Sequence, residues 1–427
     1  MRRKIVFNVP YLLSLVFAIA GQYRFSYSKD LETGSILYIV AVVLFFMSYR
    51  SRRKIENLSL ELVDNDESLI EPGIVIRLGL KSGQFWLLLF SFVLFAYVLF
   101  HAYVETASIF TLFVWAVSLV LFLIAFTDSR KVTNKSGSFY ASVNNNLYEL
   151  ITICLIIVVA LWLRFSKLGV LPLGVNQEEG FAGMGALDVI EGKLSNPFGF
   201  GPVSAWGWTY YSGLYFYCQA FFVKLFGVNV LGIRFFSAIA GTLSVIFTYL
   251  LAREIWGKSV GLISGFLIAV AGIHIHFSRF GFPFIHTCLF GTITLFFIVR
   301  AIKNKAPTDF ALAGFSIGLA QYFWTASRII PFIALIFFIF QAIQKRNFLS
   351  QYYKGLVILF TGLVLTIAPL ALPIEKKFWN FTEGASRDFI FGGWMASDYA
   401  NRLQSGESLL YMLGEQIVRS FLSFNFY

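Results

Sequence analysis

Two adjacent glutamates, Glu178 and Glu179, are the strongest candidates for catalytic residues in this sequence. The spacing from Asn176 to Glu179 is typical of a capping box, and it predicts a helix that starts after Asn176 and ends near Gly192. Capping accounts for Glu179 but leaves Glu178 without a structural role. We therefore retain both as catalytic candidates, with Glu178 as a general base that takes the proton of an acceptor hydroxyl attacking a sugar C1. Simple solvation of Glu178 is the alternative.

Such a reaction also requires a cation for a leaving phosphate, and two arginines are candidates. Arg279 and Arg328 each lie at the predicted outer end of an apolar helix. Arginine presents a planar fork of donors to phosphate oxygens and stays charged beside lipid, which suits a polyprenyl phosphate. Contact with lipid headgroups is the alternative explanation for both residues.

Metal chemistry has little support in the sequence. His274 and His276 would point to opposite sides of one helix, so we do not expect them to share a zinc ion. The three cysteines lie singly inside apolar segments, without a paired spacing, at Cys154, Cys218 and Cys288. We predict no metal ligands and no cofactor, with a requirement for a divalent metal left open.

Other polar residues of the same stretch fit simpler roles. Asp188 and Glu191 lie one turn apart on the predicted helix, where we expect them to face water. Trp208 is a candidate for stacking on a sugar ring, but anchoring at the membrane interface is the stronger interpretation.

The composition places these residues in a membrane protein. Hydrophobic residues make up 58% of the 427 positions and charged residues 13%, which is too apolar for a soluble surface and right for repeated bilayer crossings. The net charge of +11 comes from short Lys and Arg clusters between apolar runs rather than from one basic face. This pattern argues against nucleic acid as a partner and indicates topology signals instead.

Apolar stretches that are long enough for a crossing, or nearly so, recur along the chain. The eleven candidates are 5–23, 35–49, 84–101, 108–126, 148–163, 230–251, 259–277, 282–299, 309–324, 329–343 and 355–372. The sequence therefore predicts an all-α, polytopic bundle of about eleven transmembrane helices.

The basic clusters also predict the orientation of this bundle. Short loops rich in Lys and Arg stay in the cytoplasm, and alternate loops agree with this rule when the N-terminus is cytoplasmic. The loop 166–229 and the tail 374–427 are then extracytoplasmic and cover the candidate site. Counting the apolar segment 208–226 as a further crossing would misplace every later basic cluster, so we expect an outer interfacial helix there.

Two domains are expected. Residues 1–132 form an accessory block of four membrane helices, because their apolar runs contain no ionisable residue of the kind that usually marks function. A polar linker follows, and residues 147–427 form the module that carries the candidate site.

From about Leu161 onwards the chain resembles the GT-C superfamily, specifically the protein O-mannosyltransferase-like family (glycosyltransferase family 39) and the related aminoarabinose transferases. Each motif is weak alone, and their order makes them more specific. They are Leu163-Arg-Phe-Ser-Lys-Leu-Gly169 before the acidic pair, Leu214-Tyr-Phe-Tyr, Arg234-Phe-Phe-Ser-Ala238, His276-Phe-Ser-Arg-Phe-Gly281, and Gly318-Leu-Ala-Gln-Tyr322 with Ser327-Arg328.

The resemblance implies a GT-C-like fold and an inverting transfer of sugar from a polyprenyl phosphate-linked donor to an acceptor on the extracytoplasmic face. Its first-loop acid maps onto Glu178, and His276 and Tyr322 join the candidate substrate-binding residues. The acceptor is a protein, a lipid or a polysaccharide, and the other partners are membrane lipids.

Two alternatives stay open. One is a transporter or flippase of lipid-linked intermediates. The other is an inactive family member, because the family commonly has Asp-Glu where this chain has Glu178-Glu179 and usually continues beyond the point corresponding to Tyr427, as if this chain were truncated.

Overall fold

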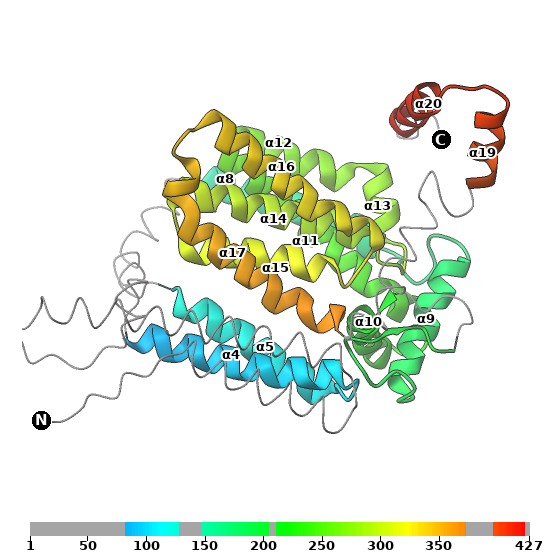
Figure 1. The fold of residues 1–427 in the computed structure, drawn as a ribbon. Coiled ribbons are helices and arrows are strands. Elements are labelled where there is room, and N and C mark those ends of the chain that lie inside the picture. Colours follow the sequence, from blue (N-terminus) through cyan, green and yellow to red (C-terminus); the bar gives the residue numbers. More distant parts are fainter. Residues whose placement is uncertain (1–81, 128–146, 205–210, 373–395, 423–427) are drawn as a thin grey trace, which may run out of the picture. The chain divides into compact units, whose positions relative to one another are not determined.

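The computed structural model describes residues 82–127, 147–204, 211–372 and 396–422. Contacts divide the chain into two units, Met1–Trp86 and Leu87–Tyr427, and nearly all described residues lie in the second unit. The elements, labelled in Figure 1, are α4 (Ser82–Tyr103), α5 (Ile109–Ala125), α8 (Leu147–Phe165), α9 (Gln177–Ile190), β1 (Phe200–Gly201), β2 (Tyr211–Ser212), α10 (Gly213–Phe226), α11 (Val230–Trp256), α12 (Lys258–Val270), α13 (Gly272–Ser278), α14 (Phe284–Asn304), α15 (Pro307–Ala320), η2 (Thr325–Arg328), α16 (Ile329–Gln344), α17 (Phe348–Ala371), α19 (Ala396–Gln404) and α20 (Leu409–Leu422).

The predicted all-α membrane fold is confirmed, and the sheet in the described part is one antiparallel pair, β1 with β2. Six of the described helices are long and apolar enough to cross a membrane, or seven if the bent pair α12–α13 is one span. The predicted number of eleven is not established. Its first two candidates lie outside the described residues, and α5 and α15 have 17 and 14 residues, fewer than an upright span needs.

Helix α10, within the segment predicted to be interfacial, is also short. Its 14 residues extend about 21 Å, which is less than the hydrocarbon thickness of about 30 Å. This length agrees with a helix that does not cross.

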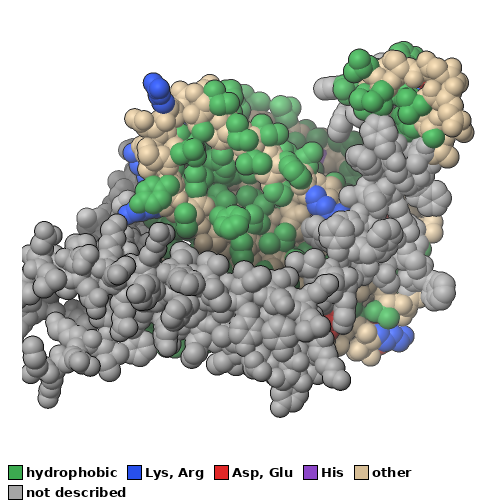
Figure 2. All heavy atoms as spheres, in the orientation of Figure 1, with side chains coloured by type: hydrophobic (Ala, Val, Ile, Leu, Met, Phe, Trp, Pro, Cys, Tyr) green, Lys and Arg blue, Asp and Glu red, His purple; other side chains and the backbone are tan. Residues whose placement is uncertain are grey.

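The surface of α16 and α17 exposes many large apolar side chains. Large side chains such as Phe332, Ile336 and Ile343 on α16 are 63%, 66% and 77% exposed. Figure 2 shows hydrophobic side chains gathered on this face. Lipid is the solvent that such a surface requires, because exposing it to water would carry the full hydrophobic cost.

Helix α11 is central to the bundle, since it contacts α8, α10, α12 and α14. Helices α15 and α17 lie side by side and form the most extensive helix pair (Figure 1). Gly314 makes their close approach possible, because a Cβ at this position would lie 2.1 Å from the Leu359 carbonyl oxygen. Small residues are the usual means of close helix packing in membranes.

The predicted span 259–277 is broken, with α12 and α13 meeting at 63°. The last carbonyls of α12 lack helical donors, and the buried Arg164 guanidinium supplies them. It donates to Ile268 at 3.1 Å and to Ala269 at 3.0 Å, and it also lies 2.9 Å from Nδ1 of His274. Sequence periodicity did not predict this break.

The predicted boundary at residue 132 lies outside the described residues, and the two predicted domains remain a prediction. Helix α5 contacts α15 and α17, and it falls in the same unit as the later helices. Near the other end of the described chain, an ion pair of Arg402 with Glu415 at 2.7 Å joins α19 to α20, and Arg402 also pairs with Glu407, in the turn between them, at 2.7 Å.

Candidate active site

The helix predicted from the capping box is present as α9. Asn176 is its N-cap, and its side-chain oxygen accepts the backbone N–H of Glu178 at 3.2 Å. The Glu179 carboxylate accepts the backbone N–H of Asn176 at 3.3 Å, which closes the box. Gly192 follows the helix with φ +77°, a conformation that glycine adopts without strain. Local sequence chemistry thus sets where Glu178 lies.

Glu179 has a second partner that the sequence did not predict. Arg234 of α11 donates to both carboxylate oxygens, Nε to Oε1 at 2.7 Å and Nη2 to Oε2 at 2.8 Å. The two side chains are 1% and 2% exposed, so this is a buried, bidentate ion pair. An arginine inside an apolar helix was the available signal, because such a charge requires a partner.

Gly281 completes this junction. Its N–H donates to Oε1 of Glu179 at 2.7 Å, and its carbonyl accepts from Gln219 at 3.1 Å. A Cβ here would lie 2.5 Å from Cγ2 of Ile233, so a larger residue would have to displace the Ile233 side chain. The start of α9, helix α10 and the turn after α13 therefore meet at one point.

Arg234 and Arg279 together fix the connection between α8 and α9. Arg234 donates to the carbonyls of Leu168, Pro172 and Gly174, and Arg279 to those of Leu163, Ser166 and Leu171, at 2.7 to 3.4 Å. Burial, and then the charge of Arg234, lowers the pKa of Arg279. Arg279 was predicted to contact a phosphate. In the structure it is 8% exposed, and its guanidinium donates to these carbonyls.

The four carboxylates of the described loop differ in their hydrogen-bond and ion-pair partners. Glu179 is paired as above, and Glu191 forms a 2.6 Å ion pair with Lys193. Asp188 was expected to face water, and this is wrong. It is 1% exposed because it accepts the backbone N–H groups of Val203 and Ser204, at 2.8 and 2.9 Å, and the Ser204 hydroxyl.

The Glu178 carboxylate stands apart from these three. Within the described residues it makes no hydrogen bond or ion pair, and it is half-buried. Burial raises its pKa above the ordinary 4.5. A carboxylate that is positioned by its backbone, lacks a partner and has raised basicity is suited to accept a proton.

Arg328 lies at the end of η2, on a turn that contacts the same region. Trp324, just before η2, packs its ring 5.3 Å from Phe282, the neighbour of Gly281. It also stacks on Tyr211 at 5.7 Å. These contacts place the η2 turn at the end of the bundle where α9 begins.

The remaining candidates are dispersed. Tyr322 is fully buried and donates its hydroxyl to the Thr366 carbonyl at 2.8 Å, which leaves no surface for a substrate. His276 is exposed beside Phe277 and Phe280. Trp208 lies outside the described residues. Among the described side chains, no group of three or more His, Cys, Asp and Glu residues is arranged to hold a metal ion.

Comparison with known proteins gives a partial match. Residues 213–371 match the family described as dolichyl-phosphate-mannose-protein mannosyltransferase. A protein of Aquifex aeolicus described as uncharacterized is 32% identical over 139 residues, which are 32% of this chain and 28% of that protein. The oligosaccharyltransferase of Archaeoglobus fulgidus, in its apo form, is similar with a TM-score of 0.42 and 20% identity, over 62% of this chain and 37% of that one.

This chain therefore spans well under half the length of the two proteins it resembles. The family match begins at Gly213, so Glu178 and Glu179 lie before it. It covers α10 to α17, the helices on which most of the predicted motifs lie. Residues 213–371 are thus similar to this mannosyltransferase family, in agreement with the resemblance that those motifs indicated.

Proposed function

We propose that this protein transfers a sugar from a polyprenyl phosphate-linked donor to an acceptor, with inversion, at the predicted extracytoplasmic end of the bundle. Glu178 is the general base. The observation that carries this proposal is the free, half-buried Glu178 carboxylate in a loop whose other described carboxylates are engaged.

The proposed step is one displacement. The Glu178 carboxylate takes the proton of the acceptor hydroxyl as its oxygen forms a bond to the sugar C1. The bond from C1 to the phosphate oxygen breaks, and the polyprenyl phosphate leaves with the electron pair. Attack on the face opposite the phosphate inverts C1. Arg328, on the η2 turn at the same end, is the proposed cation for the phosphate.

Glu179 and Arg234 would hold the proposed base, Glu178, in a fixed position. Glu179 holds the first turn of α9 to Arg234, and Arg234 holds the preceding loop through its carbonyls. A catalytic group must be held close to its working geometry by neighbours whose own positions are fixed. In this proposal Glu179 and Arg234 are positioning residues.

A transfer assay tests this function. The full chain in lipid vesicles is supplied with labelled sugar on a polyprenyl phosphate and with candidate acceptors. We expect Glu178→Gln to lower transfer at least about a hundredfold, because general base catalysis contributes about 10²–10⁴. Glu178→Asp keeps a carboxylate and retains measurable transfer. Glu191→Gln, at the C-cap of the same helix, is the matched control and leaves the rate unchanged.

Movement of lipid-linked intermediates across the membrane is the second candidate. The break between α12 and α13, with Arg164 and His274 buried beside it, resembles the discontinuous helices of transporters. Because Arg164 caps the carbonyls of α12, the break also has a structural explanation. Flipping of a labelled lipid-linked sugar by vesicles, without sugar transfer, would favour this function over the first.

A further inference from the structure

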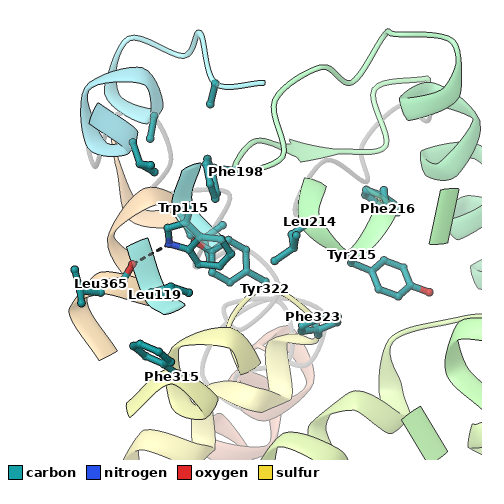
Figure 3. Packing of buried hydrophobic residues seen from close by; sticks show 14 of the residues in the cluster. Trp115, Leu119, Phe198, Leu214, Tyr215, Phe216, Phe315, Tyr322, Phe323 and Leu365 are labelled. Atoms are coloured by element: carbon teal, nitrogen blue, oxygen red, sulfur yellow. Dashed lines mark hydrogen bonds between the residues drawn. The ribbon is translucent and has the colours of Figure 1, made fainter. Parts of the chain in front are cut away.

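Helix α17 has a backbone carbonyl that its own helix leaves without a donor. Pro369 lies inside α17 and has no N–H, so the Leu365 carbonyl four residues earlier lacks its usual partner. An unpaired carbonyl is costly in a membrane interior. The indole Nε1–H of Trp115, on α5, donates to this oxygen at 2.9 Å (Figure 3).

A second aromatic donor serves the next carbonyl of α17. Tyr322, just after α15, donates its hydroxyl to the Thr366 oxygen at 2.8 Å. The rings of Trp115 and Tyr322 lie 5.6 Å apart, and these residues are 4% and 0% exposed. The two donors therefore form one buried unit around the α17 proline.

The same two rings also connect the loop after α9 with the chain segment that leads to Arg328. Phe198, in the loop that follows α9, lies 5.5 Å from the Trp115 ring and 6.3 Å from the Tyr322 ring. Tyr322 itself is two residues before Trp324, which begins the turn that carries Arg328. Figure 3 shows Phe198, Trp115 and Tyr322 grouped next to Leu365.

Helix α5 has a docking face beyond this one bond. Its buried residues follow a helical stripe, which includes Val114, Ser118 and Phe122 around Trp115. Phe122 packs against Phe315 of α15 at 5.7 Å. Loss of the indole N–H alone therefore removes one bond and leaves the rest of the helix packing in place.

We propose that Trp115 is a positioning residue of the transfer site. Its indole N–H donates to the Leu365 carbonyl, which Pro369 leaves without a helical donor. This hydrogen bond holds α5 on α15 and α17 and thereby fixes the loop that contains Phe198 and the turn that follows Tyr322. Helix α5, expected from the sequence to be accessory, is on this account a working part of the module. The assignment rests on the proposed function only where it says that this loop and turn frame the site.

Hydrogen exchange and transfer kinetics of the full chain in lipid nanodiscs test the proposal. Trp115→Phe keeps an aromatic ring but removes the donor. We expect amide exchange in residues 194–204 and 320–328 to rise about tenfold, from the loss of one buried hydrogen bond. Exchange in α8 and α12 stays unchanged. For transfer, kcat falls and the donor KM stays within about twofold. Trp162→Phe, at a tryptophan on α8 that is 70% exposed, is the matched control.

A repair variant makes the test specific to the carbonyl. Pro369→Ala returns an N–H to position 369, so Leu365 regains a donor from its own helix. In this background Trp115→Phe should lower kcat much less, and amide exchange in the two segments should return towards that of the wild-type protein. An unchanged effect of Trp115→Phe in the Pro369→Ala background, or equal behaviour of Trp115→Phe and Trp162→Phe, would overturn the proposal.

The two readouts separate this proposal from the function on which it partly rests. If the wild-type protein transfers no sugar while exchange follows the pattern above, the proposed function fails and the coupling of Trp115 to the two segments holds. If transfer is present and Trp115→Phe changes neither exchange nor kcat, the coupling fails and the function holds.

Discussion

Helix α11 has an arginine near each end, and each arginine is paired with a glutamate in a different environment. Arg234 and Arg253 are 19 residues apart, or about 28 Å along the helix, close to the hydrocarbon thickness of a bilayer. Arg234 pairs with Glu179 in a fully buried site. Arg253 pairs with Glu149 while 39% of its side chain is exposed, and Lys258 and Tyr249 share that carboxylate. The first pair is sealed and has one cation, whereas the second is open and shared.

The difference shows which pair can tolerate loss. A sealed carboxylate that loses its arginine keeps a charge that water does not reach. The Glu149 carboxylate is itself 9% exposed, but it would keep a second cation, Lys258, which is 51% exposed. We therefore infer that the Arg234 end determines the geometry of the site, and that the Arg253 end mainly adds modest stability.

The largest predicted effect is from Arg234→Met. Removing one partner of a buried ion pair costs about 3–5 kcal/mol, so we expect a large drop in the thermal midpoint in detergent and loss of transfer. Arg253→Met, on the same helix, is the matched control with a much smaller drop. Equal drops for the two variants would break the comparison. Arg234→Met combined with Glu179→Leu should recover part of the loss, because no unpaired charge then remains.

The pH dependence of transfer is the next effect in size. The base works only when ionised, so the rate falls about tenfold for each pH unit below its pKa. Because burial raises the pKa of Glu178, this fall begins above the ordinary value of 4.5. A rate profile measured from pH 4 to 8 checks this. The acid limb should be lost in Glu178→Gln, and a limb that persists there would belong to another group.

The smallest effect is expected at the open pair. Glu149→Gln should cost about 1 kcal/mol or less, since Arg253 is partly exposed and solvent screens the pair. The cost should shrink further when salt is raised to about 1 M, where the Debye length is about 3 Å. The effect of Arg234→Met should stay the same at both salt concentrations. Thermal unfolding at low and high salt measures both responses.

The sequence predicted local structure well and long-range partners poorly. The start of α9, its capping box and the glycine after it follow from Asn176, Glu179 and Gly192 because capping depends on residues a few positions apart. The partner of Glu179 is 55 positions away, and only the buried charge of Arg234 pointed to it. Apolar periodicity gave the helices but not the bend at Ala271, because the Arg164 bonds that stabilise it come from another helix.

Arg279 and Trp115 illustrate the same limit. Arginine at a predicted helix end suggested phosphate, but the guanidinium of Arg279 donates to three carbonyls in the last turn of α8 and the loop after it. Trp115 had no feature in its own segment that marked it. Its proposed role depends on the Leu365 carbonyl, 250 positions away along the chain, which Pro369 leaves without a helical donor.

The transfer rate of Glu178→Gln tests whether Glu178 is the general base. Labelled sugar on a polyprenyl phosphate is offered to the full chain in vesicles, with Glu191→Gln measured beside it and thermal midpoints recorded for both variants. We predict that Glu178→Gln folds like the wild-type protein and loses at least about 99% of the transfer, as expected when a general base is removed. Wild-type rates in a well-folded Glu178→Gln protein would contradict this prediction.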